Sequence, residues 1–254
     1  MLKELLKQKR ETSKEGFRYR GLESSRLENL TDAIFGFAIT LLVISSEVPT
    51  NYLELQASMY SFIGFIFCTM LLLSIWNKQS EFFLHFGLQD KKTKVLNFLF
   101  LFVLLFYVYP LKYLFSYLGT VIYVRIKLAF GDNSDALNLV IDGLSKSNLT
   151  TVQWGDLMIR FGLGLFFIYL IFMLKHMNAL KKREELGLNK NEVFITKTFI
   201  QSYAILMGIP LLSMLVVLLF GGKSAPISGF IYLLIPIALS VHKKYRNKRK
   251  ALLV

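Results

Sequence analysis

Charged residues are scarce in this chain. Asp, Glu, Lys and Arg make up 19% of its 254 residues, against roughly 25% in soluble domains. Hydrophobic residues make up 54%, and the mean hydropathy is +0.48. This composition excludes an ordinary soluble domain and predicts an all-α polytopic membrane protein.

Cysteine is nearly absent as well. The one cysteine, Cys68, lies in an apolar run, so the chain can form no internal disulfide, thiol zinc cluster or redox pair. The histidines His85, His176 and His242 do not occur at metal-ligand spacing. The paired glutamates at 184–185 stand in a charged loop, unlike an intramembrane metalloprotease site. We therefore expect no enzyme, no cofactor and no bound metal.

Acidic residues number only 17 against 30 basic ones, which gives a formal net charge of +13. A basic excess fits either a nucleic-acid ligand or a membrane topology, and the positions of the charges decide between them. Six segments are long and apolar enough to cross about 30 Å of hydrocarbon, at roughly 20 residues per helix. They cover about residues 27–47, 55–77, 95–124, 155–175, 198–222 and 224–241.

The lysines and arginines are distributed unevenly around these six spans. With the N-terminus in the cytoplasm, 24 of the 30 fall on the cytoplasmic side, and four fall outside. The cytoplasmic set includes Lys175, at the end of the fourth span, and Lys197, next to the start of the fifth. Because cytoplasmic loops are enriched in Lys and Arg, the pattern predicts six transmembrane helices with both termini cytoplasmic. The expected partner of the basic residues is the lipid bilayer, and no nucleic-acid ligand is expected.

The domain organisation follows from these spans. We expect a basic cytoplasmic segment at residues 1–25, a six-helix transmembrane domain at 26–242 and a basic cytoplasmic tail at 243–254. The first segment lacks the apolar core of a signal peptide and fits either a solvated tail or a short helix on anionic lipid. The outer loop at 125–154 has room for a short helix.

The first span carries a carboxylate. Ser25 and Glu28 have the spacing of a capping box, which predicts a helix that begins near Arg26. Asp32 is then about 9 Å along the helix axis. A carboxylate that faced lipid at this depth would cost about 2.5 to 3.5 kcal/mol. Asp32 is therefore expected to face protein or water.

The same helix has an apolar stripe. At 100° per residue, Asp32 lies nearly opposite this stripe, and Thr40 lies on its margin. Asp32 is accordingly predicted to brace the helix rather than to line a pore. The stripe consists of Leu30, Ile34, Phe37, Leu41 and Ile44.

Polar side chains on the second and third spans lie at the expected depth of Asp32. An indole N–H and two carboxamides can bond a buried carboxylate and a hydroxyl, and an arginine at the helix start can reach the same carboxylate. The expected network consists of Arg26, Thr31, Asp32, Trp76, Gln79 and Asn97.

These residues resemble the signature of the transmembrane protein 175 family of potassium channels, in its short prokaryotic members with one six-helix unit. The family's first helix opens with Arg, three residues, then Phe-Ser-Asp and a pattern like A-[VI]-F-A-I-A-I-T-L-L-V. The matching positions are Arg26, Leu30-Thr31-Asp32, Ala33 to Ile44, Trp76 with Gln79, Asn97 and Pro110.

The resemblance implies a potassium-selective cation channel in the plasma membrane of a prokaryote. It implies a homotetramer in which the first helix of each subunit lines a central pore that conducts potassium. By position, Phe37, Leu41 and Ile44 would form a hydrophobic constriction, and Thr40 would favour potassium over sodium. The chain has no Thr-Val-Gly-Tyr-Gly filter and no voltage-sensing arginine repeat, so a gate in this channel would act by dewetting.

The chain departs from the family pattern at three places. Leu30 and Thr31 replace Phe and Ser, Gln79 replaces a titratable His, and Phe37 stands where Ile or Leu is usual. The bulk of Phe37 keeps open a non-conducting membrane subunit as an alternative. A transporter that uses Asp32 as a coupling carboxylate is a further alternative, because intramembrane acids often serve that purpose.

Overall fold

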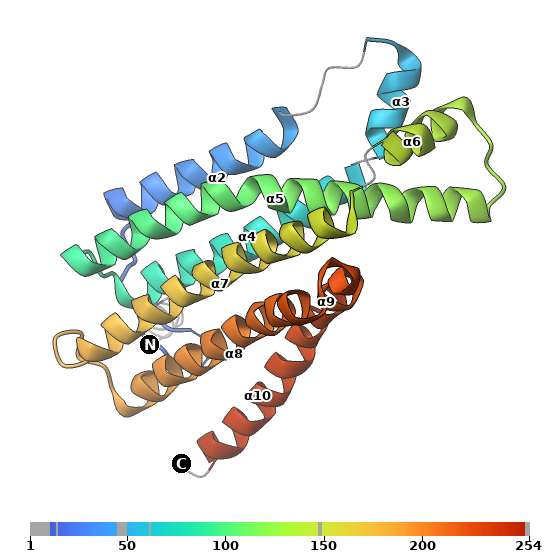
Figure 1. Ribbon diagram of the computed structural model, residues 1–254. Helices are drawn as coiled ribbons and strands as arrows, with labels where there is room; N and C mark the ends of the chain where they lie inside the picture. Colours follow the sequence, from blue (N-terminus) through green and yellow to red (C-terminus); the bar gives the residue numbers. More distant parts are fainter. Residues whose placement is uncertain (1–10, 14, 45–49, 61, 147–148, 252–254) are drawn as a thin grey trace.

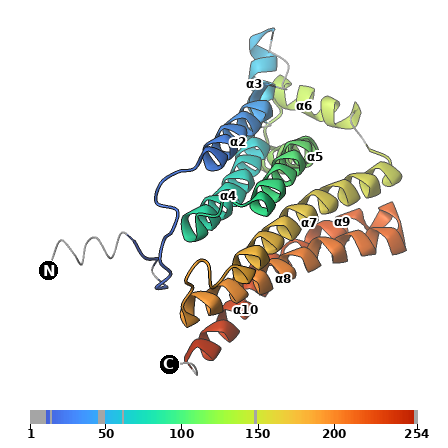
Figure 2. The same ribbon diagram turned by 90° about the vertical axis from the view of Figure 1, so that its left-hand side faces the viewer.

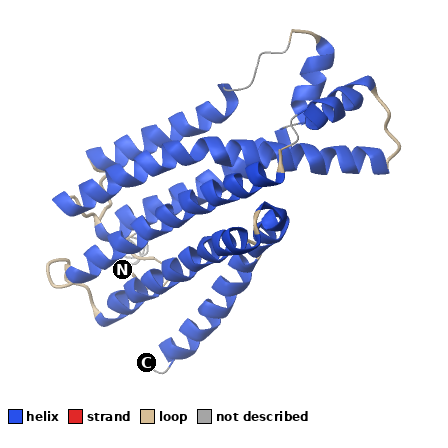
Figure 3. Cartoon of the chain, viewed as in Figure 1, coloured by secondary structure: helices blue, strands red, loops and turns tan. Residues whose placement is uncertain are grey.

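Helices form every regular element in the described part of the chain (Figure 3). The structure is a computed structural model that describes residues 11–251 except 14, 45–49, 61 and 147–148. Its elements are α2 (Arg26–Ile44), α3 (Tyr52–Tyr60), α4 (Phe62–Phe86), α5 (Lys91–Ala129), α6 (Asp135–Lys146), α7 (Thr151–Lys181), α8 (Lys190–Phe220), η1 (Gly222–Ser224), α9 (Ala225–Ile231) and α10 (Leu234–Ala251).

Four long helices form the centre of the subunit. Helix α7 packs along both α5 and α8, and α4 packs against α5 (Figure 1). Helix α2 covers α4 and α5 at one edge, while α10 contacts α8 at the opposite edge (Figure 2). A continuous hydrophobic core follows this bundle, with Phe35, Leu72, Phe100, Phe172 and Tyr203 among its buried residues.

The helices have the dimensions of a multi-pass membrane protein. Among the described residues, α4, α5, α7, α8 and the stretch at 222–248 are long and apolar enough to cross a bilayer. Helix α2 adds 19 residues that include Asp32. Helix α5 has 39 residues and is therefore about 58 Å long, so it extends well beyond a hydrocarbon layer of about 30 Å.

The second predicted span differs from the observed helices. Residues 55–60 belong to α3, which packs against α6 rather than continuing directly into the bundle. A local cap explains this separate start, because the Glu54 carboxylate accepts hydrogen bonds from the Thr50 N–H and hydroxyl, at 2.8 and 2.7 Å. Helix α4 in turn continues past Asn77 to Phe86. The short helix expected in the outer loop is present as α6.

The last predicted span is divided into two helices. Helix α9 ends at Ile231, and α10 begins at Leu234. Pro236 has no N–H with which to reach the carbonyl of Tyr232, and the Ile235 N–H bonds that carbonyl instead at 3.1 Å. The proline thus accounts for the break in this membrane segment.

Helices α4 and α5 touch backbone to backbone at two glycines. A Cβ at Gly119 would lie 2.8 Å from the Gly64 Cα, whereas a Cβ at Gly208 would meet nothing within 4 Å. We expect Gly119→Ala to lower the free energy of unfolding by about 2 kcal/mol, because overpacking forces the helices apart. Thermal unfolding in detergent measures this loss. The control Gly208→Ala should leave stability unchanged or higher, and equal destabilisation by both would contradict the prediction.

Candidate functional site

Helix α2 begins where its cap predicts. The Ser25 hydroxyl accepts a hydrogen bond from the Glu28 N–H at 3.1 Å, and the helix starts at Arg26. Buried residues then recur every three or four positions on the side that faces α4 and α5. This buried face consists of Leu27, Thr31, Phe35, Ala38 and Leu42. One side of α2 is therefore buried within the subunit.

The other side of α2 is open in the single subunit. Phe37 is 58% exposed, and Leu30 and Thr40 are also exposed. The Thr40 hydroxyl donates to the carbonyl of Gly36 at 2.6 Å, which leaves its oxygen lone pairs directed outward. Leu41 is half-buried, and the side chain of Ile44 lies outside the described part. The open face is thus centred between the predicted stripe and Thr40.

Asp32 is bonded to the second span. Its carboxylate accepts a hydrogen bond from the indole N–H of Trp76 at 2.8 Å. The carboxylate therefore joins α2 to α4 on the side away from Phe37. Arg26 is exposed, and within the described residues it forms no ion pair with Asp32.

A buried amide links α2 to α5. The Asn97 Nδ2 donates to the Thr31 hydroxyl at 2.8 Å, and the Gln79 Nε2 donates to the Asn97 Oδ1 at 2.6 Å. Thr31 donates in turn to the carbonyl of Leu27 at 2.7 Å. Thr31, Gln79 and Asn97 are all buried. Three helices therefore share one set of hydrogen bonds that leaves few donors unused.

Lys175, the last residue of the predicted fourth span, completes this network. The Lys175 ammonium donates to the Asn97 Oδ1 at 2.7 Å and to the Gln79 Oε1 at 2.9 Å, and the residue is fully buried. Its Nζ also lies 5.1 to 5.4 Å from the ring centroids of Phe82, Phe83 and Phe100. Carbonyl oxygens and aromatic faces together replace the water around this cation.

Lys175, which was counted with the cytoplasmic charges, therefore lies inside the bundle. A signal for this position was present in the sequence, because apolar residues such as Met177, Ala179 and Leu180 continue beyond it. A lone lysine with apolar residues on both sides is costly unless polar groups on other helices receive it. Residues 79 and 97 are those groups.

A second interhelical contact fixes the neighbouring ends of α5 and α7. The Asp90 carboxylate caps α5 by accepting from the Thr93 N–H at 3.4 Å, and it also accepts from the Thr93 hydroxyl at 2.6 Å and from the Asn178 amide at 3.2 Å. Partial burial opposes ionisation of Asp90. The hydrogen bonds from Thr93 and Asn178 outweigh that effect and hold the pKa of Asp90 below its ordinary value.

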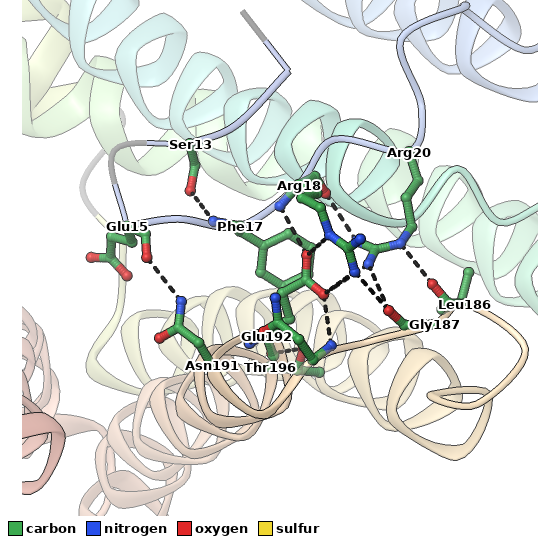
Figure 4. Close-up of polar contacts among 11 residues, drawn as sticks. Ser13, Glu15, Phe17, Arg18, Arg20, Leu186, Gly187, Asn191, Glu192 and Thr196 are labelled. Carbon is green, nitrogen blue, oxygen red and sulfur yellow. Dashed lines mark hydrogen bonds and ion pairs between the residues drawn. The ribbon is translucent and has the colours of Figure 1, made fainter. Parts of the chain in front are cut away.

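The chain before α2 is clamped to the start of α8 (Figure 4). The Glu192 carboxylate, which is fully buried, receives Arg18 Nε at 3.2 Å and Arg20 Nη2 at 2.8 Å. The two guanidinium groups also donate to the carbonyls of Gly187 and Leu186, at 2.8 and 2.9 Å. This N-terminal strap, defined here as residues 11–21, therefore binds the α7–α8 connection.

The N-terminal strap reaches both α4 and α10. Its Arg20 and Gly21 N–H groups donate to the Leu84 carbonyl at 3.1 Å. Its Glu15 carboxylate pairs with Arg246 at 2.9 Å. Residues 11–21 are thus neither a solvated tail nor a helix on lipid, and the part of the expected segment at residues 1–10 lies outside the described residues. The sequence carries one sign of the strap, the alternating arginines Arg18 and Arg20 before the capping box, which the prediction of the spans does not use.

Metal chemistry finds no support here. Within the described residues, no three His, Cys, Asp or Glu side chains converge in a way that would hold an ion. The polar cluster described above is made of amides, hydroxyls, a carboxylate, an indole and an ammonium, which join α2, α4, α5 and α7.

Comparisons with known proteins agree on one family. The sequence profile described as "Endosomal/lysosomal potassium channel TMEM175" matches residues 26–107, which include α2, α4 and part of α5. A protein of Marivirga tractuosa described as "Potassium channel" is 40% identical over 241 residues, covering 93% of this chain and 94% of that protein. A crystal structure of a variant of the potassium channel MtTMEM175, bound to a nanobody fusion, has a TM-score of 0.77 and 35% identity, covering 93% of this chain and 99% of that one.

Proposed function

This chain belongs to the TMEM175 family of potassium channels, and from that premise we propose that its pore is formed by α2 at the axis of a homotetramer. The chain is a potassium channel in a membrane. The observation that carries the proposal is the open face of α2, where Phe37 is 58% exposed although the opposite face is buried. An exposed apolar face on a membrane helix next to a small residue such as Gly36 suits contact with other copies of itself.

The proposed constriction is hydrophobic. Phe37, Leu41 and Ile44 would each contribute one ring of four apolar side chains around the axis, and such rings exclude water when the pore is narrow. Thr40 lies between these rings in sequence, and its hydroxyl oxygen has lone pairs available for a partly dehydrated cation. We propose that Thr40 favours potassium over sodium at this point.

The proposed role of the polar network is to hold α2 in place. Asp32 and Thr31 would fix the rotation of the helix through Trp76 and Asn97, so that the apolar face points to the axis. The family signature would be completed near the start of α2 by Arg26 and Leu30 of that helix and by Gln79 of α4. A coupling carboxylate must exchange protons or ions, whereas Asp32 is engaged by an indole; this arrangement favours a brace over a transporter site.

The proposed topology places both termini in the cytoplasm. Six spans, from α2 to the stretch at 222–248, would form the transmembrane domain at residues 26–242, preceded by the basic segment at 1–25 and followed by the basic tail at 243–254. The uneven distribution of lysine and arginine supports this orientation. The bacterial relative supports placement in the plasma membrane of a prokaryotic cell.

Recording in a planar bilayer tests the proposal. With potassium on one side and sodium on the other, the purified protein should show single-channel currents that reverse toward the potassium equilibrium potential. Thr40→Ala should lower the potassium preference by roughly threefold, while Thr40→Ser, which keeps the hydroxyl, should retain it. Saturable, proton-linked transport without unitary currents, lost in Asp32→Asn, would overturn the channel in favour of a transporter.

A further inference from the structure

A groove lies between α8 and α10. These two helices are at the edge of the subunit opposite to α2 (Figure 2). Its volume is about 550 Å³. Basic and polar side chains line the end near the start of α8 and the end of α10, namely Lys197, Gln201, His242 and Arg246. Apolar residues such as Ala204 and Ile205 line the part further along α8. Phe194, near the start of α8, also lines the groove, so the basic end contains one aromatic residue and the other end is apolar.

From these features we infer that the groove binds one anionic phospholipid, with the phosphate at the basic end and an acyl chain along α8. The distance from Lys197 to Ile205 is eight residues, or about 12 Å along the helix, which is enough to separate a headgroup from the start of its chains. Basic residues next to a membrane helix attract anionic headgroups. Tyr245, also in the lining, has the amphipathic ring typical of the membrane interface.

The electrostatics of the basic end favour a phosphate. Among the described residues, no acidic side chain lines the groove itself. Lys197 is exposed and forms no ion pair with any described residue, while Arg246 is half-buried and pairs with Glu15 from the N-terminal strap. The Arg246 guanidinium also donates to the Asn247 Oδ1 from Nε and Nη2, at 3.3 and 3.2 Å. It has five N–H donors, so a phosphate would share them with Glu15 and Asn247. The His242 ring contacts Ser202 and Gln201 at 3.2 and 3.3 Å, which orients it at the same rim.

The position of the groove suits lipid rather than another copy of the chain. Helix α10 contacts α8, whereas α2 contacts α4 and α5 at the other edge of the bundle (Figure 1). If α2 faces the tetramer axis, α10 faces the bilayer. This step alone depends on the proposed function, and the test below measures bound lipid without any measurement of conduction.

Native mass spectrometry of the purified full-length protein tests the inference. The probes are phosphatidylglycerol, phosphatidylcholine and inorganic phosphate. We expect one phosphatidylglycerol retained per subunit and no retained phosphatidylcholine. Lys197→Gln with Arg246→Gln should weaken phosphatidylglycerol binding by about thirtyfold, and Lys197→Gln alone by about fivefold. The single variant leaves the pair of Arg246 with Glu15 intact, so it remains informative if the double variant folds poorly.

The matched control removes the same charge outside the groove. Lys243 and Lys244 are exposed residues of α10 that do not line it. Lys243→Gln with Lys244→Gln should leave phosphatidylglycerol binding unchanged. Equal weakening by this control would show a diffuse charge effect and overturn the site, as would unchanged binding in Lys197→Gln. Displacement of the lipid by excess inorganic phosphate would show that the groove binds the free anion and would also overturn the inference.

Discussion

Replacing Phe37 with alanine is expected to raise the potassium current through single channels by about tenfold. In the proposed tetramer, the substitution removes a ring of four phenyl groups that would expel water from the constriction. Leu41→Ala should act in the same direction but less strongly, since Leu41 is half-buried rather than exposed. Flux assays with reconstituted vesicles and planar-bilayer recording both measure the change.

The control for this result is a phenylalanine that is equally open but lies on another helix. Phe102 on α5 is 72% exposed, and Phe102→Ala removes the same ring from a surface away from α2. Its current should equal that of the unmodified channel. Currents unchanged in Phe37→Ala and Leu41→Ala, or raised equally in Phe102→Ala, would show that α2 does not form the constriction.

Asn97→Leu is expected to destabilise the folded protein by about 3 kcal/mol. The substitution removes an acceptor from the buried Lys175 ammonium and a donor from Thr31, and a buried charge that loses a partner is costly. Thermal unfolding of the protein in detergent measures the effect. The exposed residue Asn138 on α6 provides the control, and Asn138→Leu should change stability by less than about 0.5 kcal/mol.

A double substitution separates this explanation from a simple packing defect. When Lys175→Met accompanies Asn97→Leu, the uncompensated charge is removed together with its former partner. The double variant should therefore be more stable than Asn97→Leu alone, which is a coupling between neighbouring residues. Additive losses in the double variant would mean that Lys175 and Asn97 contribute independently.

The sequence contained enough information to place α2 and the contacts at its first turns. Serine and glutamate at capping-box spacing indicated the start at Arg26, and a carboxylate two turns later required a protein partner, which is the Trp76 indole. These features depend on neighbours in one helix or on the cost of an isolated charge. Such constraints are local and can be recognised in a single chain.

Contacts that depend on distant segments could not be recognised in the same way. The predicted fourth span ends at Lys175 because a charged residue was taken as the end of the apolar segment. Only the fold shows that Gln79 and Asn97 accept hydrogen bonds from this lysine. The strap residues Arg18 and Arg20 bind a carboxylate more than 170 positions away. Each pairing leaves a sign at one partner only, namely the apolar residues beyond Lys175 and the alternating arginines before α2. Hydropathy and spacing do not identify the distant residue that completes the pair.

The N-terminal strap has a mechanical consequence for α2. The backbone at Arg20 and Gly21 is bonded to the Leu84 carbonyl, and Arg26 follows five residues after Gly21. The start of α2 is thus tied to the end of α4 through this short tether, and its second turn is bonded to Trp76 within α4 through Asp32. Sliding of α2 along its axis would break these hydrogen bonds, so they oppose that displacement of α2 relative to α4.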